Sequence, residues 1–307
     1  MKILVFDTEN IHTDALEMLK KDGYEVEMSG EMDLLKEGKL PEADVILIRI
    51  YNRVDKAVLD KAGRLKAIVS CSVGLDHIEK DECTKRNIEI FNAPGSNSNA
   101  VAEHTVALIL GVLRRVVEAT KHVKSGKWDR KRFMAYELEG KTMGFIGFGM
   151  IGKLVAQKLK GFGIHHVLVY DPYLNRRQIK MAGGEKMDDL HDLIKHSEII
   201  SLHLPLTEET KNLIGEGEIA LMGPETILVN TSRGGIVDEN ALIKALKNGR
   251  IYGAGLDVFE QEPPSRLRFM RVKNVVLTPH IGTMTNKAFR DMSVQATENF
   301  LKGFKKK

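Results

Sequence analysis

KTMGFIGFGMIGK, residues 141–153, joins a short apolar run to a turn that is rich in glycine. Gly147, Gly149 and Gly152 have the spacing G-x-G-x-x-G, and the residues after them follow a helical pattern. The next apolar run, HVLVYD (166–171), ends in Asp171, about 20 residues beyond the glycines. A strand, a glycine turn, a helix and an acidic residue in this order predict a dinucleotide-binding unit.

Each residue of this pattern has a separate physical task. The first glycine permits the tight turn, the second lets backbone amides approach a pyrophosphate at the helix N-terminus, and the third lets the helix lie close to the sheet. Asp171 can accept hydrogen bonds from both ribose hydroxyls and would repel a 2′-phosphate, which predicts NAD as the cofactor. Arg176 and Arg177 leave NADP open as an alternative.

Strand-like and helical patterns alternate on both sides of this segment, which predicts parallel sheets with crossover helices. A chain of 307 residues fits two such domains. One long helical pattern, residues 97–124, lies between the two sets of strands and is apolar over an arc too wide for a lone surface helix. We expect it to pack against a second domain or subunit, with His104 at that interface. The strand candidates are KILVFD (2–7), DVILIRI (44–50), LKAIVSC (65–71), EIISLHL (198–204), TILVNT (226–231), IYGAGLD (251–257) and NVVLTPH (274–280), besides the two runs above.

The composition argues against membrane, nucleic-acid and metal-binding functions. No apolar run approaches the ~20 residues of a membrane span, and the N-terminus has no signal-peptide pattern. The net charge of +4 comes largely from scattered lysines that do not interleave with aromatic residues, so no nucleic-acid partner is predicted. Cys71, Cys83 and the histidines form neither a disulfide framework nor a metal-ligand grouping. We therefore expect a cytoplasmic protein, and its basic surface would suit a small anionic substrate.

Polar residues follow three strands of the second predicted sheet. Arg233 comes after TILVNT, while Asp257 and His280 end the runs IYGAGLD and NVVLTPH. Glu262 lies a few residues after Asp257, beside two prolines that stiffen the loop. Because the carboxyl ends of parallel strands form the ligand-binding edge of such a sheet, we expect these side chains to converge near the dinucleotide.

An arginine, a glutamate and a histidine near a nicotinamide suit the interconversion of a 2-hydroxy acid and a 2-keto acid. Arg233 would grip the substrate carboxylate and polarise the carbonyl oxygen. His280 would give or take the hydroxyl proton as a hydride moves, and Glu262 would orient the imidazole and favour its protonated form. Taken singly, each could instead be structural: a surface arginine, an exposed acid in a turn, or a buried histidine.

Five motifs together resemble those of the D-isomer-specific 2-hydroxyacid dehydrogenases, and the match covers nearly the whole chain. The resemblance implies two doubly wound parallel-sheet α/β domains: a flavodoxin-like substrate domain, residues 1–96 and 284–307, and a Rossmann NAD-binding domain, residues 97–283, inserted into it. It also implies a cleft that closes on the ligand and a homodimer joined through the NAD-binding domains. The motifs are GFGMIG, SLHLPLTEETKNLI, NTSRGGIVDENAL, GAGLDVFEQEPP and TPHIG, and the loops SVGLDHI and NAPGSNSNAVAEHT agree with them.

The resemblance also implies roles for individual residues. The catalytic roles fall on Arg233, Glu262 and His280, and no metal takes part. The substrate carboxylate would bind to backbone amides of Val73 and Gly74, with Asn97 nearby. The cofactor contacts would be Gly147, Gly149, Met150, Ile151, Gly152, Asp171, His203, Pro205, Thr207, Thr231, Ser232 and Asp257, the last facing the carboxamide.

The identity of the substrate stays open at this point. Arg49 matches a position at which phosphoglycerate dehydrogenases of this family direct arginine toward the substrate phosphate, so it is a candidate substrate-binding residue. Ser70, however, stands where many of those enzymes have a second arginine, and the sequence ends at Lys307 without their regulatory domain. 3-Phosphoglycerate, glyoxylate or hydroxypyruvate, and lactate-type substrates all remain candidates, whereas Glu262 disfavours formate because formate dehydrogenases carry glutamine there.

A regulatory protein is the alternative of a different class. Corepressors that resemble this family keep its fold and its arginine, glutamate and histidine while they sense the dinucleotide and act through protein partners. The sequence has no obvious docking segment or disordered extension, which favours the enzyme.

Overall fold

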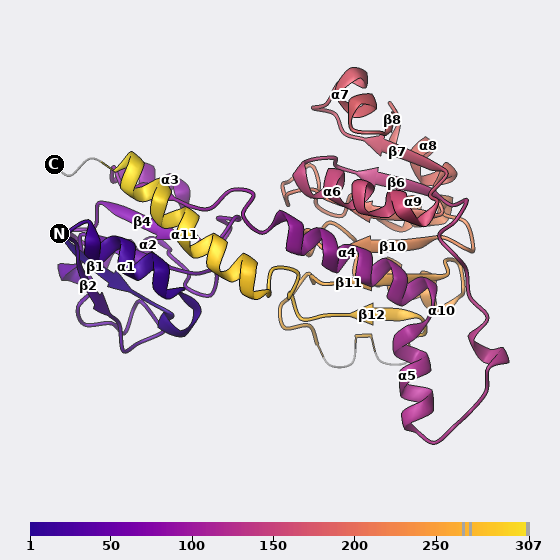
Figure 1. The fold of residues 1–307 in the computed structure, drawn as a ribbon, viewed down its shortest axis with the longest axis horizontal. Helices are drawn as coiled ribbons and strands as arrows, with labels where there is room; N and C mark the ends of the chain where they lie inside the picture. The colour runs from indigo at the N-terminus through magenta and orange to yellow at the C-terminus, as the bar shows by residue number, and fades with distance from the viewer. Residues whose placement is uncertain (266–267, 270–271, 305–307) are drawn as a thin grey trace. The chain divides into compact units, whose positions relative to one another are not determined.

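The computed structural model describes residues 1–265, 268–269 and 272–304, and within them the chain forms two compact units (Figure 1). The first unit contains Met1–Asn97 together with the chain from Thr283 onward, and the second unit is Ser98–Gly282. Residues 305–307, which the sequence analysis placed in the first domain, lie outside the described residues.

The first unit is a parallel sheet of five strands in the order β2-β1-β3-β4-β5. The order reverses between β1 and β3, so this sheet has the topological switch point of a doubly wound fold there. Alternate strand residues face opposite layers: Ile3 and Val45 pack with α1 and α11, while Leu4 and Ile46 pack with α2 and α3. Its elements are β1 (Lys2–Val5), η1 (Thr8–Asn10), α1 (Thr13–Lys21), β2 (Glu25–Met28), η2 (Leu40–Glu42), β3 (Val45–Ile48), α2 (Lys56–Lys61), β4 (Ala67–Ser70), α3 (Lys80–Lys85), β5 (Glu89–Phe91) and α11 (Asn286–Gly303).

The second unit is a parallel sheet of seven strands in the order β12-β11-β10-β9-β6-β7-β8. The chain leaves β6 in one direction and returns to β9 on its other side, so the carboxyl ends of β6 and β9 flank the switch point. Its elements are α4 (Ser98–Leu113), α5 (Val116–Lys124), η3 (Lys131–Phe133), β6 (Thr142–Ile146), α6 (Met150–Leu159), η4 (Lys160–Phe162), β7 (His166–Tyr170), α7 (Arg176–Met181), β8 (Glu185–Lys186), α8 (Leu190–His196), β9 (Ile199–Leu202), α9 (Glu216–Leu221), β10 (Ile227–Asn230), α10 (Glu239–Lys247), β11 (Gly253–Leu256) and β12 (Val275–Leu277).

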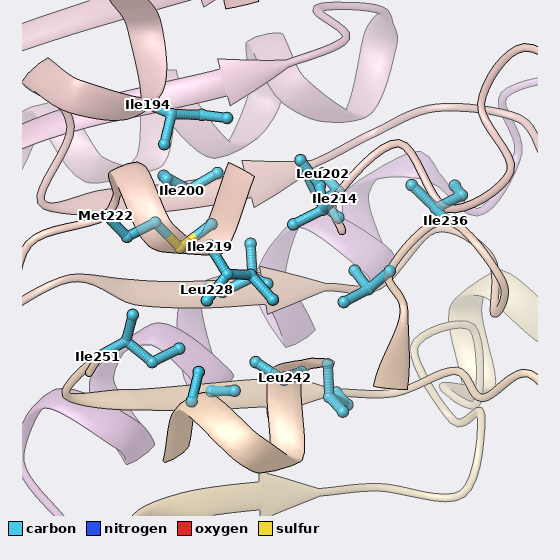
Figure 2. Packing of buried hydrophobic residues seen from close by; sticks show 14 of the residues in the cluster. Ile194, Ile200, Leu202, Ile214, Ile219, Met222, Leu228, Ile236, Leu242 and Ile251 are labelled. Carbon is cyan, nitrogen blue, oxygen red and sulfur yellow. The ribbon is translucent and has the colours of Figure 1, made fainter. Parts of the chain in front are cut away.

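The core of the second unit lies on both faces of this sheet. Ile200 and Leu228 point toward α8, α9 and α10, where they pack with Ile194 and Ile219 (Figure 2). The neighbouring residue Ile199 points the other way, into the cluster that includes α4 and α6. Because these strands are buried on both faces, they read as continuous apolar runs in the sequence. The two α/β doubly wound sheets confirm the predicted fold class.

The long helix predicted over residues 97–124 is wrong in its extent. The structure has two helices, α4 and α5, and Arg115 between them has a left-handed φ of 53°. The wide apolar arc of α4 is covered within its own unit, because α4 packs on α6 and on β10, β11 and β12. Gly253 and Gly255 of β11 make this possible: a Cβ at Gly253 would lie 2.6 Å from Val112, and a Cβ at Gly255 3.0 Å from Leu108.

Three short strands, β2, β5 and β8, were not among the strand candidates. Each lies at the edge of its sheet and none contains a buried residue. Edge strands carry charged residues and lack a continuous apolar run, so the sequence pattern does not separate them from loops. Among the described residues, no helix is long and apolar enough to cross a membrane.

Candidate cofactor and active site

The glycine turn after β6 is built as tightly as a phosphate-binding turn requires. Gly147 has a φ of 81°, and a Cβ there would lie 2.4 Å from the carbonyl oxygen of His203. Gly152 is also close-packed, since its Cβ would meet the Gly147 carbonyl oxygen at 3.1 Å. Gly149, the N-cap of α6, has open space within 4 Å of the Cβ position. The one glycine with free space beside it is thus the one at the helix N-terminus, where a pyrophosphate binds.

Asp171 lies directly after β7, beside this turn. Its two carboxylate oxygens accept hydrogen bonds from the amides of Phe148 and Tyr173, both at 2.9 Å, and the residue is buried. An ionised carboxylate has about four acceptor positions, so capacity remains for the two ribose hydroxyls of a dinucleotide. Arg176, which kept NADP open, donates to the carboxylate of Asp188 and to the carbonyl of Lys186. The open N-terminus of α6 and the placement of Asp171 therefore fit NAD.

The other candidate cofactor residues lie along the same edge of the second sheet. Met150 and Ile151 form the first turn of α6, and Met150 is exposed. The remaining residues follow the carboxyl ends of β9, β10 and β11, where doubly wound sheets bind nucleotides. They are His203, Pro205 and Thr207 after β9, Thr231 and Ser232 after β10, and Asp257 after β11.

His203 supports the glycine turn from below. Its ring stacks on Phe145, with ring centroids 5.9 Å apart, and its Nε2 hydrogen-bonds to the hydroxyl of Ser201 at 2.9 Å. Burial lowers the pKa of His203 from 6.5 to about 3, so the imidazole is neutral at physiological pH. A neutral ring packed against the turn is suited to shaping the cofactor site rather than to proton transfer.

Hydrogen bonds before Arg233 and close packing after it hold the turn in which Arg233 lies. Its carbonyl accepts a hydrogen bond from the Asn230 amide group at 2.8 Å, and its guanidinium Nη1 donates to the Ser232 carbonyl at 2.7 Å. A Cβ at Gly234 would lie 1.7 Å from the carbonyl oxygen of Phe259, so only glycine fits there. The closest neighbour of Gly234 is thus the loop that carries Glu262.

His280 and Glu262 form a hydrogen-bonded pair. The His280 Nδ1 lies 2.8 Å from Oε2 of Glu262, and Glu262 Oε1 accepts from the Phe259 amide at 3.1 Å. An ionised carboxylate only accepts, so His280 carries its proton on Nδ1 in this contact, which leaves Nε2 for a substrate. Both side chains keep more than a third of their surface exposed, 35% and 39%.

The structure brings the three candidate catalytic residues to three consecutive strand ends. Arg233 follows β10, Glu262 lies in the loop after β11, and His280 follows β12. Gly234 packs on the loop that contains Glu262, and Glu262 contacts His280, so the turns are in mutual contact. No group of three or more potential metal ligands occurs among the described residues.

Asp257 is the most buried acid at this edge, with 1% of its surface exposed. It accepts hydrogen bonds from the Thr278 hydroxyl at 2.6 Å and from the amides of Ile281 and Gly282 at 2.9 and 2.8 Å. Burial by itself raises the pKa of Asp257, but hydrogen bonds from His104, Thr278 and these amides outweigh it, so the pKa lies below its usual value.

Sequence reasoning missed the parts that His104 and Thr278 play at this edge. His104 was expected at an interface, but its Nε2 lies 2.9 Å from the Thr278 hydroxyl and 3.3 Å from Oδ1 of Asp257. The residues are far apart in the chain, on α4 and after β12, and no local pattern connects them. Nothing in the sequence distinguishes His104 within α4, because Glu103 and Thr105 beside it are polar as well.

The four candidate substrate-binding residues all belong to the first unit or its boundary. The Val73 carbonyl accepts from the Asn92 side chain at 2.8 Å, the Gly74 carbonyl accepts from the Ser72 hydroxyl at 2.7 Å, and Asn97 is buried. These bonds fix the loop after β4 at the carboxyl edge of the first sheet, where its amides could bind an anion.

Arg49 follows β3 at the same edge of the first sheet, with 4% of its surface exposed. Its Nη1 donates to the Asn10 carbonyl at 3.0 Å, and its guanidinium carbon lies 5.2 Å from the centre of the Phe289 ring. The guanidinium is thus held by groups of its own unit.

Comparisons with known proteins show the family to which the chain belongs. The family model for the D-isomer specific 2-hydroxyacid dehydrogenase, NAD binding domain, matches residues 106–282. The chain is 42% identical to a glyoxylate reductase of Thermococcus litoralis, over 98% of this chain and 93% of that protein. It is 43% identical to a D-3-phosphoglycerate dehydrogenase of Methanocaldococcus jannaschii, over 94% of this chain and 54% of that protein, so it spans about half the length of that relative.

A solved structure is similar over almost the whole chain. It is D-lactate dehydrogenase from Aquifex aeolicus complexed with NAD and lactic acid, with a TM-score of 0.84, 32% identity, and coverage of 99% of this chain and 96% of that one. All three of these relatives are named as dehydrogenases or reductases, and nothing in them supports a regulatory protein.

Proposed function

Since the chain belongs to the D-isomer specific 2-hydroxyacid dehydrogenase family, we propose that it is an NAD-dependent oxidoreductase that interconverts a D-2-hydroxy acid and a 2-keto acid. The observation that carries the proposal is the His280–Glu262 hydrogen bond of 2.8 Å, at the edge of the sheet that holds the glycine turn. Such a pair is a proton donor and acceptor with a fixed orientation.

The second unit holds the cofactor. The amides at the N-terminus of α6 bind the pyrophosphate beside Gly149, and Asp171 accepts the ribose hydroxyls. NAD bound there would supply the acceptor for a hydride from carbon 2 of the hydroxy acid, and NADH would supply the hydride for the 2-keto acid. The remaining cofactor contacts proposed from the family are the residues after β9, β10 and β11 named above.

Arg233 binds and orients the substrate. Its planar guanidinium can donate two parallel hydrogen bonds to the carboxylate and carbonyl oxygens of a 2-keto acid. This contact draws electron density toward the carbonyl oxygen, which makes carbon 2 a better hydride acceptor. The Gly234 contact with Phe259 holds the arginine turn at a fixed distance from the loop of Glu262.

His280 moves the proton at the same oxygen. In the reducing direction, the protonated ring gives the Nε2 proton to the carbonyl oxygen of the substrate, and in the oxidising direction the neutral ring takes the hydroxyl proton. Glu262 accepts the hydrogen bond from Nδ1 throughout, which fixes the ring orientation and stabilises its charged form.

We propose a small 2-keto acid of the glyoxylate or hydroxypyruvate type as the substrate, and that Val73, Gly74 and Asn97 help to bind its carboxylate. The support is the near full-length similarity to a glyoxylate reductase. A second support is Arg49, whose guanidinium is buried against Phe289 and the Asn10 carbonyl instead of being exposed to a phosphate group. 3-Phosphohydroxypyruvate and pyruvate are the competing substrates, so a test must include both.

A substrate panel tests the proposal. The protein is mixed with NADH and glyoxylate, hydroxypyruvate, 3-phosphohydroxypyruvate or pyruvate, and the consumption of NADH is followed by absorbance. We expect the highest kcat/KM with glyoxylate or hydroxypyruvate. Highest kcat/KM with the phosphorylated acid would replace the proposed substrate, and the absence of turnover with any of the four acids despite NADH binding would contradict the proposed function.

We also propose that two copies of the chain associate through the second unit. The support for this interface comes from α5 and the segment after it, because α5 has no buried residue. Large apolar side chains are exposed there: Val116 (51%), Val123 (52%), Trp128 (80%) and Met134 (79%). Several large apolar side chains exposed along one segment are typical of an interface. Trp128 is the only tryptophan of the chain, so its fluorescence should shift to longer wavelength when the protein is diluted below the dimer dissociation constant. A concentration-independent mass of one chain by sedimentation would contradict the dimer.

For the location of the protein, we propose the cytoplasm. Cys71 and Cys83 are both free and buried, which agrees with a reducing compartment.

A further inference from the structure

The turn that carries His280 has an unfavourable backbone conformation. His280 has a φ of 54°, in the left-handed region that a residue with a Cβ adopts only when its surroundings hold it there. The groups that hold it are the next two amides: those of Ile281 and Gly282 donate to opposite oxygens of the Asp257 carboxylate, at 2.9 and 2.8 Å. The direction of the His280 side chain therefore depends on the orientation of Asp257.

Asp257 is in turn oriented by two side chains. Thr278, two residues before His280, donates its hydroxyl to Oδ1 at 2.6 Å, and an ionised carboxylate can only accept this bond. A hydroxyl has one hydrogen, so the Thr278 oxygen must accept from Nε2 of His104, at 2.9 Å. The His104 N–H thus donates to the Thr278 oxygen, with Oδ1 of Asp257 3.3 Å away, and the Thr278 O–H donates to the Asp257 carboxylate. The same carboxylate accepts both amides that follow His280.

We propose that Thr278 and His104 are positioning residues for the proton donor His280, and that they act through the carboxylate of Asp257. The inference rests on the proposed function, because it takes His280 as the group that exchanges the proton with the substrate. Neither residue needs to touch substrate or cofactor. Their task is to keep the His280 turn where its ring meets Glu262, and a misplacement of about 1 Å at a reacting group can cost on the order of a hundredfold in rate.

The charged and titratable groups that face this turn, besides His280 itself, come from three segments of the chain. Glu262 on the loop after β11 faces the His280 ring directly, Asp257 at the end of β11 lies beneath the turn, and His104 on α4 lies beside Asp257. If the backbone at His280 leaves its left-handed conformation, the His280 ring loses its contact with Glu262. The pH profile of the reaction therefore reports on the positioning, whereas a general loss of stability would lower activity at all pH values alike.

Thr278→Val and Thr278→Ser are the decisive pair of variants. Valine keeps the shape of the side chain but removes the hydroxyl, and serine restores the hydroxyl. We expect Thr278→Val to lower kcat for 2-keto acid reduction about 10- to 100-fold with a smaller change in KM, and to move the alkaline decline of the profile to lower pH. Thr278→Ser should recover most of the lost kcat and the parental profile. Thr84→Val makes the same chemical change at an exposed position of α3 and serves as the control.

His104→Gln and His104→Leu form the second pair. Glutamine can place an N–H donor near the position of Nε2, whereas leucine fills space without one. We expect His104→Leu to shift the pH profile in the same direction as Thr278→Val, and His104→Gln to shift it less. The combined Thr278→Val and His104→Leu variant should lose less than the product of the two single losses, because both substitutions break one chain of hydrogen bonds.

Amide hydrogen exchange of the protein without substrate or cofactor tests the same inference independently of activity. In Thr278→Val the amides of Ile281 and Gly282 should exchange at least tenfold faster than in the parent, while amides of β6 and β9 stay unchanged. Parental exchange at these two amides together with a parental pH profile would overturn the inference, as would a serine variant as impaired as the valine variant. A parent that reduces no 2-keto acid would instead contradict the proposed function, and the exchange result would still decide whether Thr278 holds the turn.

Discussion

Substitution of Arg233 tests the proposed contact with the substrate carboxylate independently of cofactor binding. In Arg233→Lys the positive charge stays but the planar fork that matches a carboxylate is lost. We expect the loss of roughly 2 to 4 kcal/mol of transition-state stabilisation, hence a fall in kcat/KM of about thirty- to a thousandfold. Steady-state kinetics with the best 2-keto acid measures it.

The control for this variant is NADH binding in the absence of substrate, which should stay close to that of the parent. If Arg233→Lys kept near-parental kcat/KM for every acid that the parent reduces, the turn would be scaffold. The carboxylate would then have to bind elsewhere, and Arg49 would be the first residue to test.

We propose that Asp171 governs the choice between NAD and NADP. Its carboxylate already accepts the amides of Phe148 and Tyr173, so it is fixed in place where it would repel a 2′-phosphate. We expect kcat/KM to be at least tenfold higher with NADH than with NADPH, which corresponds to about 1.4 kcal/mol. Asp171→Ser should narrow this gap, chiefly by weakening the use of NADH. Equal use of the two cofactors by the parent would refute the assignment.

Single residues of the site differ in how far the sequence could place them. Arg233, Glu262 and His280 could be proposed because each follows an apolar run, and parallel strand ends meet at one edge. The left-handed φ of His280 and its support by Asp257, Thr278 and His104 could not be proposed, because they arise from contacts between α4, β11 and β12 that no local spacing encodes.

Among the elements, the turn after β10 and the loop after β11 act as one packed pair. Gly234→Ala should separate them, since the added Cβ would overlap the Phe259 carbonyl oxygen at 1.7 Å. We expect a loss of about 2 to 4 kcal/mol in the free energy of unfolding, or a displaced Glu262 loop with lower kcat. Gly217→Ala in α9, where the Cβ position has nothing within 4 Å, should change stability by no more than about 1 kcal/mol. Denaturant unfolding measures the free energy of unfolding of both variants. Equal values would show that the Glu262 loop moves aside at no cost in stability, contrary to this expectation.

His203, which packs against the glycine turn, should make the stability of the second unit fall at acid pH. The folded His203 resists protonation until about pH 3, whereas the unfolded residue takes a proton near its ordinary pKa of 6.5. Stability from this residue is therefore complete above about pH 6.5 and is lost as the pH falls toward 3. We expect the stability of His203→Gln to depend less steeply on pH between these values. Because the pKa of His77 is lowered to about 4 by burial, some slope should remain. Identical slopes in the parent and the variant would contradict this role.

The strands that are buried on both faces of a sheet could be predicted from the sequence, whereas the strands at the sheet edges could not. The central strands of both sheets are continuous apolar runs, whereas β2, β5 and β8 are short edges without a buried residue. The break between α4 and α5 escaped prediction because Arg114 and Arg115 suit a helix by propensity. Arg115 there bonds to Glu118, three residues later, at 2.9 Å and to the Arg132 carbonyl at 2.7 Å, and the second of these is a tertiary contact.

For the molecule as a whole, the candidate residues are distributed over two parallel sheets. The second supplies the glycine turn, Asp171 and the three candidate catalytic residues, and the first supplies Arg49 and the loop of Val73 and Gly74. The last helix, α11, packs on α1, β4 and β5, so the chain returns to its first sheet after completing the second. A helical pattern alone does not show which sheet a helix joins. In the sequence, only the resemblance to a family indicated the return.

The proposed function requires that a hydride pass between the cofactor and carbon 2 of a 2-keto acid, with His280 as the proton donor and acceptor. The most direct test uses NADH with deuterium at both positions of the reactive ring carbon, the preferred keto acid, and mass spectrometry of the product. We expect a 2-hydroxy acid that carries one deuterium on carbon 2, formed by the parent and not by His280→Ala, although the variant binds NADH. A product without deuterium, or a His280→Ala variant that forms the deuterated product at the parental rate, would contradict the proposed function.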